Sequence, residues 1–243
     1  MTAGMVRWGG IAVFIGVALV VLFPFVMIAF VGLQGLQAGA GGVAAASVAA
    51  RTISAVVNIV MLAIMVYVFF ATKSYFNALS YRRANIPIYI IIGVQLVSAV
   101  LGLTMNTGAG MASLIQTGNT KALGIVVFIF LITVLVFFVA LLIFAIFSIG
   151  FGNVGGGVWK AVGILYLIGL IGIIVGVLVI GISVAAAGGG GGLRAVPSGA
   201  AIGGIVLVVV AVLCYAGAII CHGIGLVLGA GRMERIVNPV DVF

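Results

Sequence analysis

The chain has 243 residues, of which 66% are hydrophobic and only 5% are charged. A typical soluble domain is about one quarter charged, and no soluble fold of this size could bury so much apolar side chain. The composition therefore excludes a soluble enzyme. It predicts an all-α, polytopic membrane protein, because apolar runs long enough to cross a bilayer as helices recur along the whole chain.

The formal net charge of +8 does not indicate nucleic-acid binding. The ten basic residues are scattered singly or in pairs, and they form no basic stripe of the kind that binds a phosphate backbone. We expect them instead to contact lipid headgroups and to set the topology of the chain.

Six membrane-spanning helices are predicted, arranged as three hairpins in series. In chain order they cover about 10–33, 53–71, 87–105, 123–149, 158–185 and 201–229. Each is long enough for a hydrocarbon core of about 30 Å. Residues 1–230 are therefore expected to form one transmembrane domain, and residues 231–243 a short tail.

The first predicted span contains Pro24. Proline lacks a backbone N–H, so we expect it to kink this helix or to break one backbone hydrogen bond. The stretch 34–51 that follows is rich in glycine and alanine, and we expect it to be a loop that leads into the second span.

Two amide side chains lie well inside spans, Asn58 in the second and Gln95 in the third. An intramembrane amide commonly hydrogen-bonds a neighbouring helix, which contributes about 0.5–2 kcal/mol. This is the favoured interpretation of both residues. The alternative is that the two amides together line a polar path.

The fourth span is bulky on all sides. Its phenylalanines form no single stripe around the helix, so we expect it to face lipid or a large apolar partner surface. They are Phe128, Phe130, Phe137, Phe138, Phe144 and Phe147.

Small residues at helical spacing predict that the fifth and sixth spans pack closely, because such residues let two backbones approach. The residues expected at this contact are Gly169, Gly172, Gly176, Gly217, Cys221 and Gly225. Cys214 and Cys221 lie seven positions apart in one span. At about 10 Å along a helix axis they are too distant for a disulfide.

Little in the spans predicts catalysis or cofactor binding. They contain no Asp or Glu, which removes carboxylate proton relays, carboxylate metal sites and catalytic triads. His222 is the only histidine, and a metal site needs three or four convergent ligands. We expect His222 to lie near a helix end, bonded to a backbone carbonyl, and Lys160 with Trp159 to form a pair at the membrane interface. No enzyme, metal or other cofactor is predicted.

The tail at 231–243 is interpreted as a partner-docking segment, with a frayed end as the alternative. The glycines of 229–231 are expected to end the sixth helix. Arg232 and Arg235 would then anchor at the headgroups, and Phe243 would fill a pocket on a partner.

The basic residues predict that both termini are cytoplasmic, because cytoplasmic loops carry an excess of Lys and Arg. The side with both termini has seven of them, Arg7, Lys73, Arg82, Arg83, Lys160, Arg232 and Arg235. The opposite side has three, Arg51, Lys121 and Arg194.

Taken together, these features favour a non-catalytic structural or accessory subunit of a larger membrane assembly, either a membrane complex or a virion envelope. Its expected partners are membrane lipids and other membrane subunits or copies of itself, with no nucleic acid. The alternative is a channel or facilitator for a small solute or ion, with Asn58 and Gln95 in its lining. An enzyme or electron carrier is disfavoured by the missing carboxylates.

Overall fold

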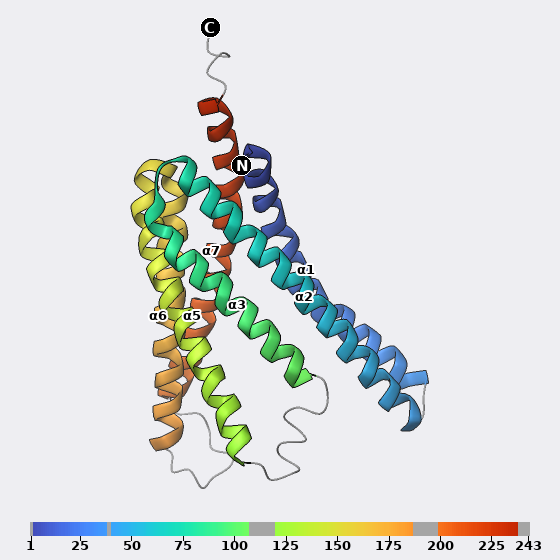
Figure 1. Ribbon diagram of the computed structural model, residues 1–243. Coiled ribbons are helices and arrows are strands. Elements are labelled where there is room, and N and C mark those ends of the chain that lie inside the picture. The colour runs from blue at the N-terminus through green and yellow to red at the C-terminus, as the bar shows by residue number, and fades with distance from the viewer. Residues whose placement is uncertain (1, 38–39, 107–119, 187–198, 238–243) are drawn as a thin grey trace.

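The computed structural model describes residues 2–37, 40–106, 120–186 and 199–237, with side chains for 2–22, 52–101, 124–125, 128–183 and 202–235. Within these ranges the chain forms six α-helices and one 3-10 turn (Figure 1). The helices are α1 (Ala3–Gln37), α2 (Ala40–Ala78), α3 (Asn85–Asn106), α5 (Thr120–Gly155), α6 (Gly157–Ala186) and α7 (Gly199–Val237), and the turn is η1 (Arg82–Ala84). Six helical segments are long and apolar enough to cross a membrane. The predicted all-α bundle of six membrane-spanning helices is confirmed.

The six helices form a ring in chain order. Each helix packs against the next one along the chain, and α7 returns to pack against α1, with the most extensive interface between α6 and α7. A smaller contact joins α2 to α7 across the interior. The interior of the ring is therefore bounded by helices on every side and divided by the α2–α7 contact.

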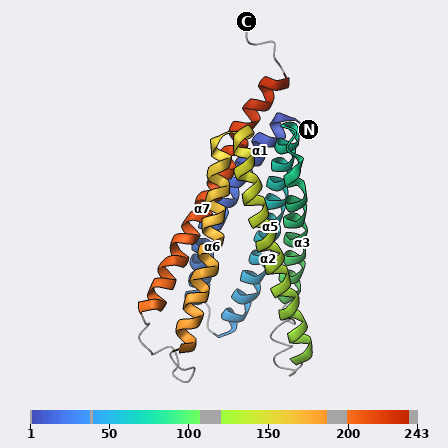
Figure 2. The same ribbon diagram turned by 90° about the vertical axis from the view of Figure 1, so that its left-hand side faces the viewer.

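The two ends of the ring differ. At one end lie the start of α1, η1, the junction of α5 with α6 and the last turns of α7, and we call this the closed end. Toward the opposite end, which we call the open end, the α1–α2 pair diverges from α5 and α6 (Figure 1, Figure 2). The start of α1 and the end of α7 lie at the same end, as an even number of spans requires.

The predicted loop at 34–51 is wrong. Helix α1 continues to Gln37 and α2 begins at Ala40, so nearly all of this stretch is helical. Alanine is the strongest helix former, and its abundance here outweighs the glycines. Helix α1 is also continuous through position 24, so Pro24 does not end it.

Tight connections join the helices at the closed end. Only Gly156 separates α5 from α6, and its φ of +104° is a conformation that favours glycine. Between α2 and η1, Ser80 has a φ of 62° and the Tyr81 N–H donates to the Phe76 carbonyl at 2.8 Å. These short turns fix the relative positions of α2 and α3 and of α5 and α6 at the closed end.

An aromatic cluster fills the closed end. Phe76 lies at its centre, with ring centroids 3.9 Å from Phe151, 4.9 Å from Trp159 and 6.3 Å from Phe144. Trp159 is only 1% exposed, so the expected interfacial position of Trp159 is wrong, whereas Lys160 is exposed near the start of α6. The indole is buried because Gly225 of α7 leaves room for it, a Cβ there lying 3.0 Å from the ring.

The outer surface of the ring is apolar. Most side chains of the spans remain uncovered by the chain itself, and the buried share is as low as 11% in the α2 span and 17% in the α7 span. Such a surface is stable only against lipid or against another apolar protein surface. The fold therefore belongs in a membrane as a multi-pass protein.

Candidate functional site

Asn58 and Gln95 line one cavity. This cavity, which we call the amide cavity, has a volume of about 440 Å³ and lies between α2, α3 and α7. Ser98 and Tyr215 contribute the other polar side chains of its wall. Asn58 lies in the membrane-spanning segment Thr52–Ala78 and Gln95 in the segment Arg82–Leu101, each nearer the open end of its span, so the cavity lies within the membrane-spanning part of the bundle.

The two amides have no hydrogen-bond partner among the residues that the structure describes. An amide transferred from water to an apolar medium without a partner costs roughly 1–3 kcal/mol in proteins. Water or a polar solute in the cavity removes this cost. A water molecule occupies about 30 Å³ of liquid volume, so the cavity has room for several waters or one small solute.

No residue with a formal charge lines the amide cavity. Ion pathways normally use rings of charged side chains or of backbone carbonyls. The lining here offers amide donors and acceptors, a serine hydroxyl and a tyrosine hydroxyl, set among aliphatic and methionine side chains. Chemically, this arrangement suits a neutral polar solute better than an ion.

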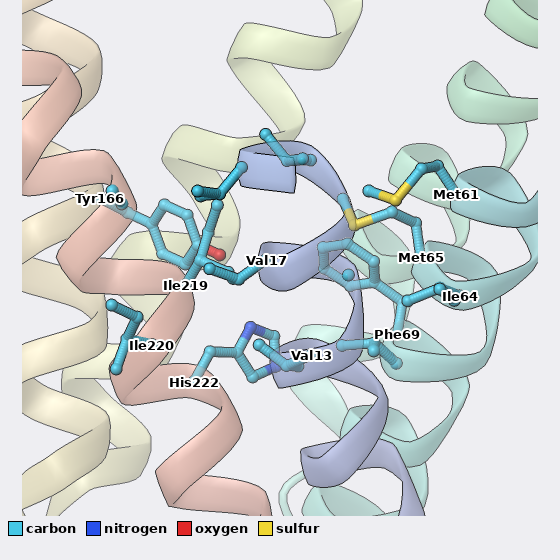
Figure 3. A pocket seen from close by; sticks show the side chains of 15 residues that line it. Val13, Val17, Met61, Ile64, Met65, Phe69, Tyr166, Ile219, Ile220 and His222 are labelled. Atoms are coloured by element: carbon cyan, nitrogen blue, oxygen red, sulfur yellow. The ribbon is translucent and has the colours of Figure 1, made fainter. Parts of the chain in front are cut away.

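A second cavity lies on the other side of a shared wall. It has a volume of about 210 Å³, is lined from α1, α2, α6 and α7, and contains His222 and Tyr166; we call it the histidine cavity (Figure 3). Met61, Met65 and Ile219 line both cavities. The α2–α7 contact therefore separates a polar compartment from a mainly apolar one.

His222 is fixed in the interior and is only 2% exposed. Its Nε2 lies 2.7 Å from the Thr72 hydroxyl of α2, which also donates to the Val68 carbonyl at 2.8 Å. Four aromatic rings surround the imidazole, with centroids 5.2 to 6.5 Å away: Trp159, Phe144, Phe69 and Tyr166. The expected position near a helix end is wrong, because α7 continues for four turns beyond residue 222.

The side chains that the structure describes contain no group of three or more His, Cys, Asp or Glu that could hold a metal ion. Cys214 and Cys221 are free thiols. Thr72 and Tyr166 were not singled out from the sequence. The available signal was the presence of a hydroxyl inside an apolar span, but hydroxyls in such spans frequently bond their own helix, as Ser148 does here.

The expected small residues of α6 face α7. A Cβ added to Gly172 would lie 2.7 Å from the Ala211 Cβ, and one added to Gly176 would lie 2.5 Å from Val208. A Cβ added to Gly169 would lie 3.0 Å from the Ala211 carbonyl oxygen of the α7 backbone. These three glycines therefore permit the backbone approach that the α6–α7 interface requires.

The small residues of α7 differ in how closely they contact neighbouring helices. Gly225 faces the Trp159 ring, whereas a Cβ on Gly217 would make an ordinary contact of 3.6 Å with Leu165. Cys221 is partly buried against the core. Close approach from α7 therefore depends on Gly225 much more than on Gly217.

The prediction that glycines 229–231 end the last helix is wrong, since α7 continues to Val237. Gly229 packs on the Tyr75 ring, where a Cβ would lie 2.6 Å away, and Ala230 and Met233 are buried. This packing offsets the helix penalty of about 1 kcal/mol for each glycine.

Arg232 is therefore part of the bundle. Its Nη1 donates to the Gly155 carbonyl at 2.7 Å, which binds the end of α5 to α7. Two residues later, Glu234 pairs with Arg7 of α1 at 2.9 Å. Arg235 is exposed in the last turn of α7, and Phe243 lies outside the described residues.

No protein-family model, no curated protein and no solved structure matches this chain.

Proposed function

We propose that this chain is a non-enzymatic membrane protein that admits a small neutral polar solute to the interior of its helical ring, as a channel or facilitator does. The observation that carries the proposal is the amide cavity, in which Asn58 and Gln95 share one lining within the membrane-spanning part of the bundle. Intramembrane polar groups are costly and are a marker of solute pathways. The absence of formal charge from the lining favours neutral solutes.

A flux experiment tests this proposal. The full chain is reconstituted in liposomes, and glycerol and urea entry is followed by stopped-flow light scattering. We expect uptake above that of protein-free liposomes, and we expect the double variant Asn58→Leu/Gln95→Leu to lose most of the difference. Ser183→Ala is the control, because Ser183 bonds its own helix at Val179. Uptake equal to protein-free liposomes would contradict the proposal.

A second candidate is the structural or accessory subunit favoured by the sequence. It is supported by the low buried share of the α2 and α7 spans, which leaves apolar surface for lipid, other membrane subunits or further copies of the chain. Native mass spectrometry of the protein extracted from its own membrane separates the candidates. A defined complex favours the subunit, and a lipid-bound monomer with solute flux favours the facilitator.

We further propose that both termini are cytoplasmic, on the strength of the seven-to-three distribution of basic residues. A cysteine introduced at position 190, in a chain whose two native cysteines are replaced by alanine, should react with an impermeant reagent from outside the cell. Reaction from the cytoplasmic side alone would reverse the topology.

A further inference from the structure

The histidine cavity contains two buried polar side chains that aim into it. Tyr166 is 3% exposed and His222 is 2% exposed, so both are covered by the bundle. Figure 3 shows the Tyr166 hydroxyl and one edge of the His222 ring directed into the space that Val17 and Ile219 border. The rest of the wall is aliphatic, aromatic or thioether.

The Thr72 hydroxyl contacts His222 Nε2 at 2.7 Å, and we assign the proton of the ring from this contact. If the hydroxyl donates its one hydrogen to the Val68 carbonyl at 2.8 Å, it accepts from His222, and Nε2 carries the proton. In the neutral ring Nδ1 is then left as an acceptor.

The Tyr166 hydroxyl is the complementary group. Among the described residues it has no hydrogen-bond partner, although its ring packs against Tyr215 and Phe144. A hydroxyl that opens onto an apolar cavity without a partner is unfavourable. The cavity thus presents one donor, Tyr166 O–H, and one acceptor, His222 Nδ1.

The size and rim of the cavity indicate how a ligand would be held. An engineered cavity of about 150 Å³ is large enough for benzene, so a volume of about 210 Å³ admits a polar head and a short apolar segment. Val20 and Val21 of α1 and Ile220 of α7 line the cavity and are also exposed. A longer apolar chain can therefore leave between α1 and α7 toward the lipid.

We infer that the histidine cavity is a binding site for a lipid-soluble alcohol. A single hydroxyl satisfies both polar groups, since it donates to His222 Nδ1 and accepts from the Tyr166 hydroxyl. A carbonyl or an ether oxygen could only accept, and it would leave Nδ1 without a partner. This site is separate from the amide cavity, so it stands or falls independently of the solute-flux proposal.

Photolabelling tests the inference in the intact protein in lipid nanodiscs. The probe is a twelve-carbon primary alcohol with a diazirine in its chain, and 1-dodecanol and dodecyl methyl ether are the competitors. We expect saturable labelling of α1 and α7 near the cavity, displaced by the alcohol at about tenfold lower concentration than by the ether. Equal displacement by alcohol and ether, or labelling that does not saturate, would overturn the inference.

Two variants test the residues. Tyr166→Phe removes only the hydroxyl, and we expect it to weaken alcohol binding about tenfold. Tyr215→Phe, in the other cavity, is the matched control and should bind like the wild type. Val17→Trp fills the cavity and should abolish saturable labelling. Unchanged binding in Tyr166→Phe, or in a folded Val17→Trp protein, would place the alcohol elsewhere.

Discussion

The closed end and the amide cavity differ in whether their polar side chains have hydrogen-bond partners within the bundle. At the closed end, Arg232 and Tyr75 both donate to the Gly155 carbonyl, at 2.7 and 3.3 Å, and Arg7 pairs with Glu234. In the amide cavity, Asn58 has no such partner among the described residues. Partnered groups hold helices together, whereas unpartnered groups remain available to a ligand or to water.

Not every buried polar atom at the closed end has a hydrogen-bond partner. Asn85 Oδ1 and Trp159 Nε1 are buried there without a hydrogen-bond partner in the described part of the chain. The other polar atom of Asn85, Nδ2, donates to Asn77 Oδ1 at 3.1 Å, and neither Asn85 nor Trp159 lines either cavity. The amide cavity differs because several polar side chains converge on one open space.

The largest expected effect concerns the packing of α7 at the closed end. Gly229→Leu would drive a side chain into the Tyr75 ring, which lies 2.6 Å from the position of a Cβ. We expect the free energy of unfolding in detergent to fall by about 3 kcal/mol. Gly231→Leu is the control, because nothing lies within 4 Å of a Cβ at that position. Equal losses in the two variants would show that the closed end is not rigid.

The α6–α7 interface should respond slightly less, because a Cβ at Gly172 or Gly176 would meet one methyl carbon closer than 3.0 Å, whereas a Cβ at Gly229 would meet three atoms of the Tyr75 ring that close. Gly172→Leu and Gly176→Leu are each expected to lower the free energy of unfolding by about 2 kcal/mol. Gly181→Leu on the same helix meets nothing within 4 Å and should be neutral. If both interface variants assemble with unchanged stability, these glycines do not set the approach of the two helices.

Removing one hydrogen bond at the closed end should cost less again. Arg232→Ala deletes the donor to the Gly155 carbonyl, and we expect a loss of about 1.5 kcal/mol, since the donor is charged. Arg235→Ala removes an exposed charge and should have no measurable effect on the melting temperature. Identical melting temperatures for the two variants would mean that the Arg232 bond contributes nothing to stability.

The smallest effect on stability is expected in the amide cavity. Asn58→Leu and Gln95→Leu remove polar groups that have no partner, so each should change the free energy of unfolding by less than about 0.5 kcal/mol or raise it slightly. A loss comparable to that of Arg232→Ala would show that the amides hold the bundle together and are not free to bind a solute.

Hydropathy was sufficient to predict the six spans, because crossing a bilayer demands length and apolar composition that few other structures have. It could not predict where the helices end. Helix α2 begins as early as residue 40 because the stretch is rich in alanine, and α7 continues beyond Gly229 because that glycine packs against Tyr75. Helix ends of this kind depend on propensity and on tertiary contacts that a hydrophobic pattern does not contain.

The candidate site was predictable only in its residue types. Asn58 and Gln95 stand out as intramembrane amides, but their convergence depends on the rotation and tilt of two helices, which sequence spacing does not determine. The partner of His222 was unpredictable for the same reason, because Thr72 is 150 positions away. The sequence favoured an interfacial position for Trp159. Its burial depends on the space that Gly225 leaves on a neighbouring helix, which sequence spacing does not show.

The most direct test of the difference between the amide cavity and the buried core is the water accessibility of thiols introduced at two serine positions. In a chain with both native cysteines replaced by alanine, Ser98→Cys places a thiol in the amide cavity, and Ser148→Cys places one at a fully buried position on α5. A small charged methanethiosulfonate reagent reacts only with a hydrated thiol. We predict rapid modification at position 98 and none at position 148. A position 98 thiol as unreactive as that at 148 would mean that the amide cavity is dry, and would contradict the proposed solute site.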